Sequence, residues 1–200
     1  MTKSLKDSSE PTEAEQKEDL RRRLNVSSLE QTFKNFKVFL GNKDAARAFK
    51  LFAAGKPEAP LLLCLGTNGN GKTHLLEATA IAMSRRMWKW PEFIDLLKSK
   101  MGKEYEGYSY DEVLANRKQA PVLLIDDIGL GTLGREWETS LMEELIDYRY
   151  HNWLPTAMTT NLDLVDFTPR VRDRFHDNER CLVVVNKGQS QRGRAKELHS

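Results

Sequence analysis

The sequence predicts an α/β protein in which a parallel five-stranded sheet is covered by helices on both faces. Short apolar runs alternate along the chain with segments of helical periodicity, which is the pattern of parallel strands joined by crossover helices. The first run leads into residues 66–73, GTNGNGKT, which fit the phosphate-loop pattern G-x-x-x-x-G-K-[ST] at every fixed position. A later run, residues 122–127, ends in two aspartates. The carboxyl ends of strands are where an open α/β sheet binds its ligands.

The individual elements follow from apolar periodicity and from helix-start signals. Pro91 and the pair Thr168-Pro169 fit the first positions of helices, because proline there loses no hydrogen bond and threonine can cap. We predict strands at residues 61–65, 87–90, 122–126, 155–160 and 181–185. We predict helices at residues 44–54, 73–86 and 136–150, and two more that begin at residues 91 and 169.

Composition indicates a soluble globular protein. The 200 residues suffice for one domain with a proper core, and 30% of them are charged. No apolar run is long enough to span a bilayer, and residues 1–23 hold no stretch of signal-peptide type. Cys64 and Cys181 lie in apolar runs and are interpreted as reduced core thiols. We therefore expect a cytoplasmic protein with no membrane partner, and the net charge of +2 requires any basic surface to be local.

The chain divides into four predicted segments. Residues 1–19 mix charged residues with Ser and Thr and hold hardly any apolar side chain, which predicts a disordered charged tail. Residues 20–40 thread apolar side chains through polar ones and are interpreted as an N-terminal linker. Residues 41–194 are the predicted nucleotide-binding core, and residues 195–200 a short tail.

The phosphate loop predicts a nucleotide-binding site. Glycines let backbone N–H groups curl around a β-phosphate, and the start of the following helix adds a favourable dipole. Lys72 would neutralise the β- and γ-phosphate oxygens, and the Thr73 hydroxyl would bind the Mg²⁺ of ATP. An ordinary Gly- and Asn-rich turn is the alternative, which the strand before the loop and the helix after it disfavour. The predicted nucleotide-binding residues are Gly66, Thr67, Asn68, Gly69, Asn70, Gly71, Lys72, Thr73 and His74.

Polar side chains at two further strand ends complete the predicted chemistry. Asp126 would hold the Mg²⁺ through its water shell, and Asp127 would orient or deprotonate the attacking water. An ordinary Asp-Asp turn is the alternative. The next strand ends in Thr159, Thr160 and Asn161, residue types that are often only turn formers. A neutral amide beside two aspartates is also suited to holding a water or a γ-phosphate oxygen.

These segments, in this order, resemble the AAA+ ATPases of the initiator and helicase-loader clade. Within that clade the likeness is greatest to the DnaC/DnaI helicase loaders and to the IstB-type transposition helper ATPases, and it spans about residues 28–194. The segments that look alike are residues 32–36 (TFKNF), 123–129 (LLIDDIG), 148–161 (YRYHNWLPTAMTTN), 170–175 (RVRDRF) and 190–192 (SQR).

The resemblance implies that ATP is bound between neighbouring subunits of a ring or spiral. Arg174 matches the arginine that reaches the γ-phosphate of the next subunit, and Arg192 matches the second sensor, which touches the γ-phosphate in its own chain. A solvated helix-face arginine and a frayed basic terminus are the respective alternatives. Phe33, Phe36 and Val38 match the linker that flanks adenine in the family, although core packing explains them almost as well.

The chain departs from the family pattern in three ways. The acid after the metal-binding aspartate is Asp127, where AAA+ proteins usually have glutamate, and its shorter reach favours slow hydrolysis and a switch role. Because about fifteen residues follow the last predicted strand, we expect the helical lid domain to be absent or vestigial. The region before Phe33 is shorter than the helicase-binding domain of a loader. A compact helicase anchor at about residues 16–30, or one supplied elsewhere, is therefore expected.

Residues 93–117 are the predicted nucleic-acid surface. They interleave cations with tyrosines, and single-strand binders combine cations with aromatic stacking platforms. The stretch also occupies the place of the helical insertion that lines the DNA channel in the family. Acidic residues dilute its charge, so a plain solvated helix and loop is the alternative. The residues concerned are Lys98, Lys100, Lys103, Arg117, Tyr105, Tyr108 and Tyr110, with a possible extension to Arg85, Arg86, Trp88, Lys89 and Trp90.

The sequence thus predicts an ATP-binding and hydrolysing DNA-replication factor of helicase-loader type. We expect it to assemble through ATP-bridged subunits on single-stranded DNA and to act on a replicative DNA helicase. The alternatives are an IstB-type transposition helper on duplex DNA, a small P-loop metabolite kinase, and a nucleotide-binding scaffold that never hydrolyses ATP. The predicted catalytic residues are Lys72, Asp126, Asp127, Asn161, Arg174 and Arg192.

Overall fold

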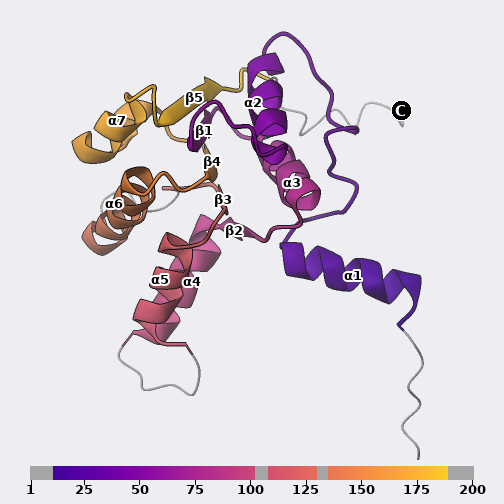
Figure 1. Ribbon diagram of the computed structural model, residues 1–200, viewed down its shortest axis with the longest axis horizontal. Coiled ribbons are helices and arrows are strands. Elements are labelled where there is room, and N and C mark those ends of the chain that lie inside the picture. Colours follow the sequence, from indigo (N-terminus) through magenta and orange to yellow (C-terminus); the bar gives the residue numbers. More distant parts are fainter. Residues whose placement is uncertain (1–10, 102–107, 130–134, 189–200) are drawn as a thin grey trace, which may run out of the picture.

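The computed structural model of the chain describes residues 11–101, 108–129 and 135–188 (Figure 1). Five strands form one sheet in the order β2-β3-β4-β1-β5, and every neighbouring pair is parallel. The predicted parallel five-stranded sheet is therefore confirmed. The strands are β1 (Leu61–Leu65), β2 (Met87–Lys89), β3 (Leu123–Asp126), β4 (Thr156–Thr160) and β5 (Cys181–Val185).

Helices cover both faces of this sheet, with α2 and α3 on one side and α4 to α7 on the other (Figure 1). Successive strand residues alternate between the two cores: Leu61 and Leu63 pack with the α4–α7 side, and Leu62 and Cys64 with the α2–α3 side. Because both faces are covered, β1 and β5 are continuous hydrophobic runs. The helices are α2 (Lys43–Ala53), α3 (Lys72–Met83), α4 (Trp90–Lys100), α5 (Tyr110–Lys118), α6 (Glu136–His151) and α7 (Pro169–Phe175), and a short 3-10 helix, η1, spans Leu164–Asp166.

The predicted helix starts are confirmed where the sequence carried a capping signal. Thr168 caps α7 by accepting from Val171 N, and Pro169 is the first helical residue. Helix α5 was not predicted, although Ser109 and Glu112 form a capping box at its start. Both cysteines are buried and free. Within the described ranges, no helix has both the length and the apolar character needed to cross a membrane.

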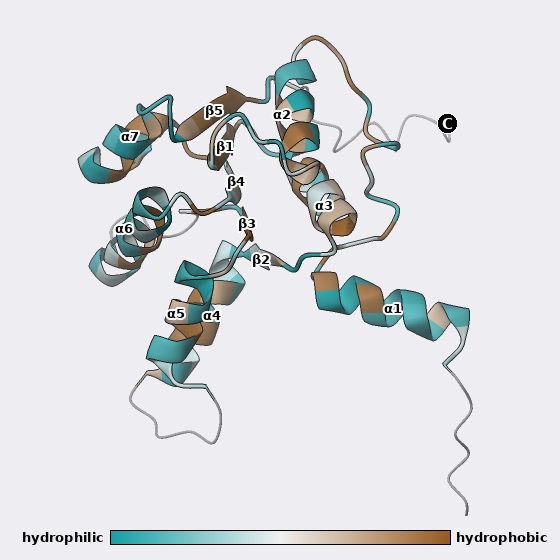
Figure 2. Ribbon diagram, in the orientation of Figure 1, coloured by the Kyte–Doolittle hydropathy of each residue, from teal (hydrophilic) through white to brown (hydrophobic). Residues whose placement is uncertain are grey.

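The prediction of a disordered tail over residues 1–19 is wrong for its C-terminal part, which lies in helix α1 (Glu13–Leu24). Residues 1–10 lie outside the described part of the chain. A capping box between Thr12 and Glu15 starts the helix, and ion pairs such as Glu13–Lys17 link successive turns. Figure 2 shows α1 as mostly hydrophilic, in contrast to the hydrophobic strands β1, β3 and β5. The charged side chains of this helix pair with one another, so the helix needs no apolar face. Without an apolar face its sequence has the composition of a disordered segment, which is why the prediction failed.

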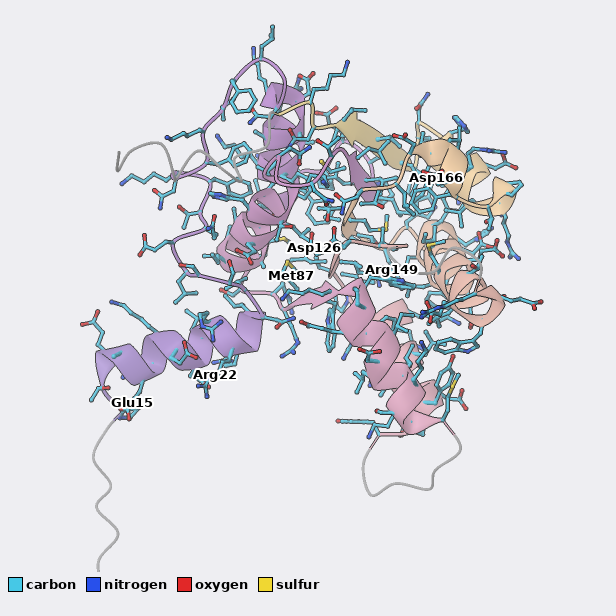
Figure 3. All side chains as sticks on the ribbon, turned by 180° about the vertical axis from the view of Figure 1, so that it is seen from behind. Glu15, Arg22, Met87, Asp126, Arg149 and Asp166 are labelled. Carbon is cyan, nitrogen blue, oxygen red and sulfur yellow. The ribbon has the colours of Figure 1, made fainter. Side chains whose placement is uncertain are left out.

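Buried Arg149 ties α6 to the starts of two strands (Figure 3). Its guanidinium donates to the carbonyl oxygens of Arg117, Lys118 and Ala120, which lead into β3. It also donates to Pro155 O at 2.8 Å and to Thr156 Oγ1 at 2.6 Å, where β4 begins. Burial lowers the pKa of Arg149 to about 10, yet five hydrogen bonds compensate for that desolvation. The planar fork of donors is what an arginine supplies and a lysine cannot.

We expect Arg149→Met to lower the free energy of unfolding by about 3 kcal/mol or more, because four partly buried carbonyl groups and a buried hydroxyl would lose their donor at once. Equilibrium urea unfolding, followed by fluorescence, measures the change. The matched control is Arg85→Met, which removes an exposed guanidinium and should change the unfolding free energy by about 0.5 kcal/mol or less. If Arg149→Met lowered the free energy of unfolding as little as the control does, Arg149 would not be what ties α6 to the two strands.

Candidate functional site

The phosphate loop surrounds a cavity of about 260 Å³ at the carboxyl edge of the sheet. It is lined by residues 68–73 together with Asp127 and Asn161, which come from the ends of β3 and β4. Gly71 stands at the N-cap of α3 with φ 96° and offers no capping side chain. The first N–H groups of α3 therefore lack a side-chain cap, which leaves them suited to bind an anion. A side chain at Gly71 would also run into Phe36, 2.9 Å from the position of its Cβ.

Lys72 is buried and lines this cavity. Its ammonium donates to Gly66 O at 2.8 Å and Thr67 O at 2.9 Å, which are backbone groups of the loop itself. It also donates to Asn161 Oδ1 at 2.8 Å. The structure therefore brings together two residues that the sequence placed 89 positions apart.

Thr73 and Asp126 meet at the position predicted for Mg²⁺. The Thr73 hydroxyl donates to Asp126 Oδ2 at 3.0 Å, and the Thr159 hydroxyl donates to the other carboxylate oxygen. A hydroxyl and a carboxylate are the hard oxygen ligands that Mg²⁺ prefers beside nucleotide phosphates, so these residues fit the ion. Burial raises the pKa of Asp126, the Thr159 hydroxyl opposes that rise, and the charge of Asp127 adds to it.

Asp127 adopts a left-handed backbone conformation, φ 55°, directly after β3. Only a few non-glycine residues, aspartate and asparagine above all, tolerate this region. Its N–H donates to Thr159 Oγ1 at 3.2 Å, and its carboxylate accepts from Asn161 Nδ2 at 3.0 Å. The turn thereby places the carboxylate on the cavity wall. Strain at one residue is characteristic of functional sites.

The linker before α2 is fastened along α3 at three points. Ser27 donates through its N–H and its hydroxyl to the buried carboxylate of Glu77. His74 Nε2 lies 2.9 Å from Thr32 O, and its ring meets Phe36 edge-on at 5.2 Å. His74 thus joins the loop's helix to the linker. Of the residues matched to an adenine-flanking linker, Phe36 is buried, Phe33 packs on the core, and Val38 is about half exposed.

Asn186 is a site residue that the sequence analysis missed. It follows β5, is buried, and exchanges hydrogen bonds with Asn70 of the phosphate loop: Asn70 Nδ2 donates to Asn186 O at 2.6 Å, and Asn186 Nδ2 donates to Asn70 O at 3.1 Å. Its side-chain oxygen also accepts from Gly188 N at 3.0 Å. The only sequence signal was a polar residue directly after an apolar strand, the same signal that marked Asn161.

Arg174 is not brought to the phosphate loop of its own chain. It lies on α7, where its guanidinium forms an ion pair with Asp147 of α6 at 3.0 Å and lies 5.0 Å from the centre of the Tyr150 ring. Arg192, the other predicted γ-phosphate sensor, lies outside the described residues. The cavity therefore contains Lys72, Asp127 and Asn161 of the predicted catalytic residues.

Several residues of the predicted nucleic-acid surface make contacts within the protein. Lys98 forms an ion pair with buried Glu138 at 2.6 Å. Arg117 stacks on Trp88 with its Cζ 3.8 Å from the ring centre. Tyr110 packs tilted against Trp137, whereas Tyr108 is exposed. Lys103 and Tyr105 lie outside the described part of the chain.

The sheet order, the loop before α3 and the acids after β3 together define a P-loop nucleotide-binding domain of the AAA+ type. The chain belongs to the family of IstB-like ATP binding proteins (IstB_IS21), whose model matches residues 20–197. It is therefore an ATP-binding AAA+ protein of the DnaC/IstB clade, as the sequence predicted.

Relatives support this assignment to different degrees. The phage-like element PBSX protein XkdC of Bacillus subtilis (strain 168) is 28% identical over 131 residues, which cover 62% of this chain and 49% of XkdC. AMPPCP-bound DnaA from Aquifex aeolicus superposes with a TM-score of 0.67 at 21% identity, over 80% of this chain and 50% of that one. A DnaC helicase loader gives 0.63 at 22% identity, over 78% and 97%. At these identities the structures establish the shared fold. The chain spans about half the length of XkdC and of that DnaA.

We expect Asp126→Asn to raise the melting temperature of the nucleotide-free protein by a few degrees at pH 7. The folded state raises the pKa of Asp126, so the carboxylate lowers stability increasingly as the pH rises above its ordinary pKa, and by its full amount above the raised value. Below the ordinary pKa of an aspartate, about 3.9, both states are protonated and this destabilisation is absent. The gain should therefore shrink as the pH falls toward 4.

Thermal unfolding of both proteins between pH 4 and 8 measures this difference, with the exposed Asp95→Asn as control. The same Asp126→Asn protein should gain less stability from added ATP and Mg²⁺ than the wild type does. A pH-independent loss of stability in Asp126→Asn would contradict the argument.

Proposed function

We propose that this protein hydrolyses ATP slowly, at sites shared between subunits, as a DNA-replication factor of helicase-loader type. The observation that carries the hydrolytic part is the amide of Asn161. Its oxygen accepts from Lys72 and its nitrogen donates to Asp127, so one neutral group links the predicted phosphate-binding cation to the predicted base. All three residues line the same cavity.

Each side chain has a separate role in the proposed reaction. Lys72 neutralises charge on the β- and γ-phosphates, and the N–H groups at the start of α3 bind phosphate oxygens. Asp127 orients the attacking water and accepts its proton, while Asn161 holds the Asp127 carboxylate in place. Thr73 and Asp126 would hold Mg²⁺, whose charge stabilises the phosphoryl oxygens when it is bound. The short reach of Asp127 is why slow turnover is proposed.

The second half of the proposed site comes from another copy of the chain. Arg174 lies on α7, which packs on α6 and β5 rather than lining the cavity. A guanidinium delivered from a neighbour would stabilise the charge that develops on the γ-phosphate. ATP at this junction would then hold subunits together, which is the proposed basis of self-association.

The proposed partners are single-stranded DNA and a replicative DNA helicase, and these imply a cytoplasmic protein. A DnaC helicase loader shares the fold over nearly its whole length, and a DnaA structure of the same fold holds single-stranded DNA. The family model favours the second candidate, an IstB-type transposition helper that assembles on duplex DNA. A comparison of turnover with single-stranded DNA and with duplex DNA of the same length separates these two candidates.

We expect Asp127→Asn to retain binding of Mg²⁺·ATP but to reduce turnover on the order of a hundredfold, because only the base is lost. Asparagine also tolerates the left-handed backbone at this position. Lys72→Ala is the contrasting variant and should lose ATP affinity itself. Phosphate release with and without single-stranded DNA, together with equilibrium binding of a fluorescent ATP analogue, measures both effects. An Asp127→Asn protein that hydrolyses ATP at the wild-type rate would refute the assigned role.

Mixing two inactive variants tests the shared site. Arg174→Ala should bind ATP nearly normally yet lose turnover on the order of 10³-fold, as expected for an arginine supplied to a neighbour's phosphate. Adding Lys72→Ala protein should restore part of the activity, since an intact Lys72 site can then face an intact Arg174. ATP should also shift the wild type, but not Arg174→Ala, toward larger species in sizing experiments. No recovery at any mixing ratio, with full activity in dilute monomer, would rule out shared sites.

A further inference from the structure

Asp147 is a largely buried carboxylate on α6 that does not line the nucleotide cavity and faces two arginines of α7. Its side chain is 10% exposed, and it forms ion pairs with Arg174 and with Arg170. Arg174 is 29% exposed and Arg170 is 61% exposed. Asp147 therefore holds Arg174 in the more sheltered of the two pairs. No role in nucleotide binding explains a carboxylate placed here.

Asp147 constrains Arg174 at a particular atom. The ion pair runs through Nε, which donates to Asp147 Oδ1 at 3.0 Å. Arginine carries five N–H donors in one plane, so a bond at Nε fixes the direction of the plane in which the two terminal nitrogens lie. A lysine-like point charge could not be oriented in this way.

Tyr150 supports the same guanidinium from one turn further along α6. Its ring centre lies 5.0 Å from Arg174 Cζ, and residues three apart on a helix share one face. The ring is itself fixed, because its hydroxyl donates to Asp177 at 2.5 Å and Arg180 lies 4.9 Å from its centre. The guanidinium thus has a carboxylate at one edge and an aromatic face beside it.

Stability alone is a weak explanation for this arrangement. Partly exposed ion pairs typically contribute at most about 1 kcal/mol, and this pair immobilises a long side chain. Orientation has a larger effect when a side chain must meet a phosphate, since a misplacement of about 1 Å can reduce a rate on the order of a hundredfold.

We propose that Asp147 is a positioning residue, which holds Arg174 in the orientation that a neighbouring subunit's ATP requires. The inference rests on the proposed shared site and assigns it a second residue on the donating subunit. It predicts that Asp147 acts in the same half of the site as Arg174 and in the opposite half from Lys72.

Pairwise mixing tests this assignment. Asp147→Ala should bind ATP with wild-type affinity but lose turnover on the order of tenfold or more, in kcat rather than KM. Mixing it with Lys72→Ala should restore activity, because Asp147→Ala supplies an intact loop and Lys72→Ala an intact donor face. Mixing it with Arg174→Ala should restore nothing, because both defects lie on the donor face. A variant that failed to fold would not recover activity with Lys72→Ala, so this pattern separates a positioning role from a folding defect.

Three further variants complete the design. Glu144→Ala removes another α6 acid whose ion-pair partner, Lys118, lies on α5 and not α7, and it should leave turnover unchanged. Asp147→Asn keeps the side-chain shape and replaces Asp147→Ala if that variant fails to fold. It should regain activity when mixed with Lys72→Ala and none when mixed with Arg174→Ala. Asp147→Glu, which restores the charge, should recover part of the turnover.

The outcomes separate the two proposals. If Lys72→Ala and Arg174→Ala do not restore each other, the shared site itself fails. If they do, but Asp147→Ala or Asp147→Asn turns over at the wild-type rate, only the positioning role fails. Faster turnover in the Asp147 variants would show that Asp147 restrains Arg174 instead of presenting it, and would also overturn the inference. If mixing an Asp147 variant with Arg174→Ala restored turnover, Asp147 would not act in the same half of the site as Arg174, and the inference would be wrong.

Discussion

A sheet buried on both faces can carry polar side chains only where each has a partner, and this constraint organises the site. Unpaired polar groups in such an interior lower stability by several kcal/mol. β1 and β3 are accordingly apolar up to Asp126, and the threonines of β4 all form hydrogen bonds. The polar side chains of the site lie at or just after the carboxyl ends of the strands. Because the strands are parallel, these ends meet at one edge, where each polar group satisfies the next.

The contacts at that edge form two connected sets. In one, the hydroxyls of Thr73 and Thr159 both donate to Asp126. In the other, Asn161 accepts from Lys72 and donates to Asp127. The ends of β3 and β4 and the start of α3, which follows β1, supply the members of each set, so the parallel order of β1, β4 and β3 is a requirement of the site. A nucleotide phosphate or a metal ion would exchange with contacts that already exist.

Much of the fold and of this edge could be predicted from the sequence because both depend on local patterns. Apolar runs predicted β1, β3 and β5, and polar residues at strand ends marked Asp126 and Asn161. Arg149 could not be assigned in this way, since its carbonyl and hydroxyl partners are brought close only by the folded chain. Asn186 carried the same signal as Asn161, but only the folded chain shows that it bonds to Asn70 of the phosphate loop. Helix α1 was missed for the opposite reason: its stabilising contacts are local, but they are ion pairs that composition cannot distinguish from disorder.

The phosphate loop is held from both ends of the domain, and this gives a physical route by which nucleotide could affect distant segments. Asn186, after the edge strand β5, bonds to Asn70 within the loop. On the other side, Phe36 of the linker packs against Gly71, and the linker continues through Ser27 and Asn25 to the end of α1.

A change in loop conformation on binding phosphate would act on both attachments at once, because neither can relax without losing buried hydrogen bonds or ring contacts. The segment after β5 and the N-terminal helix are thus coupled to the same eight-residue loop. By contrast, Arg174 is fixed by α6 through Asp147 and Tyr150 and has no such attachment to the loop among the described contacts. Within the described part of one chain no direct contact joins the loop to this arginine, whereas a nucleotide shared between two chains would contact both.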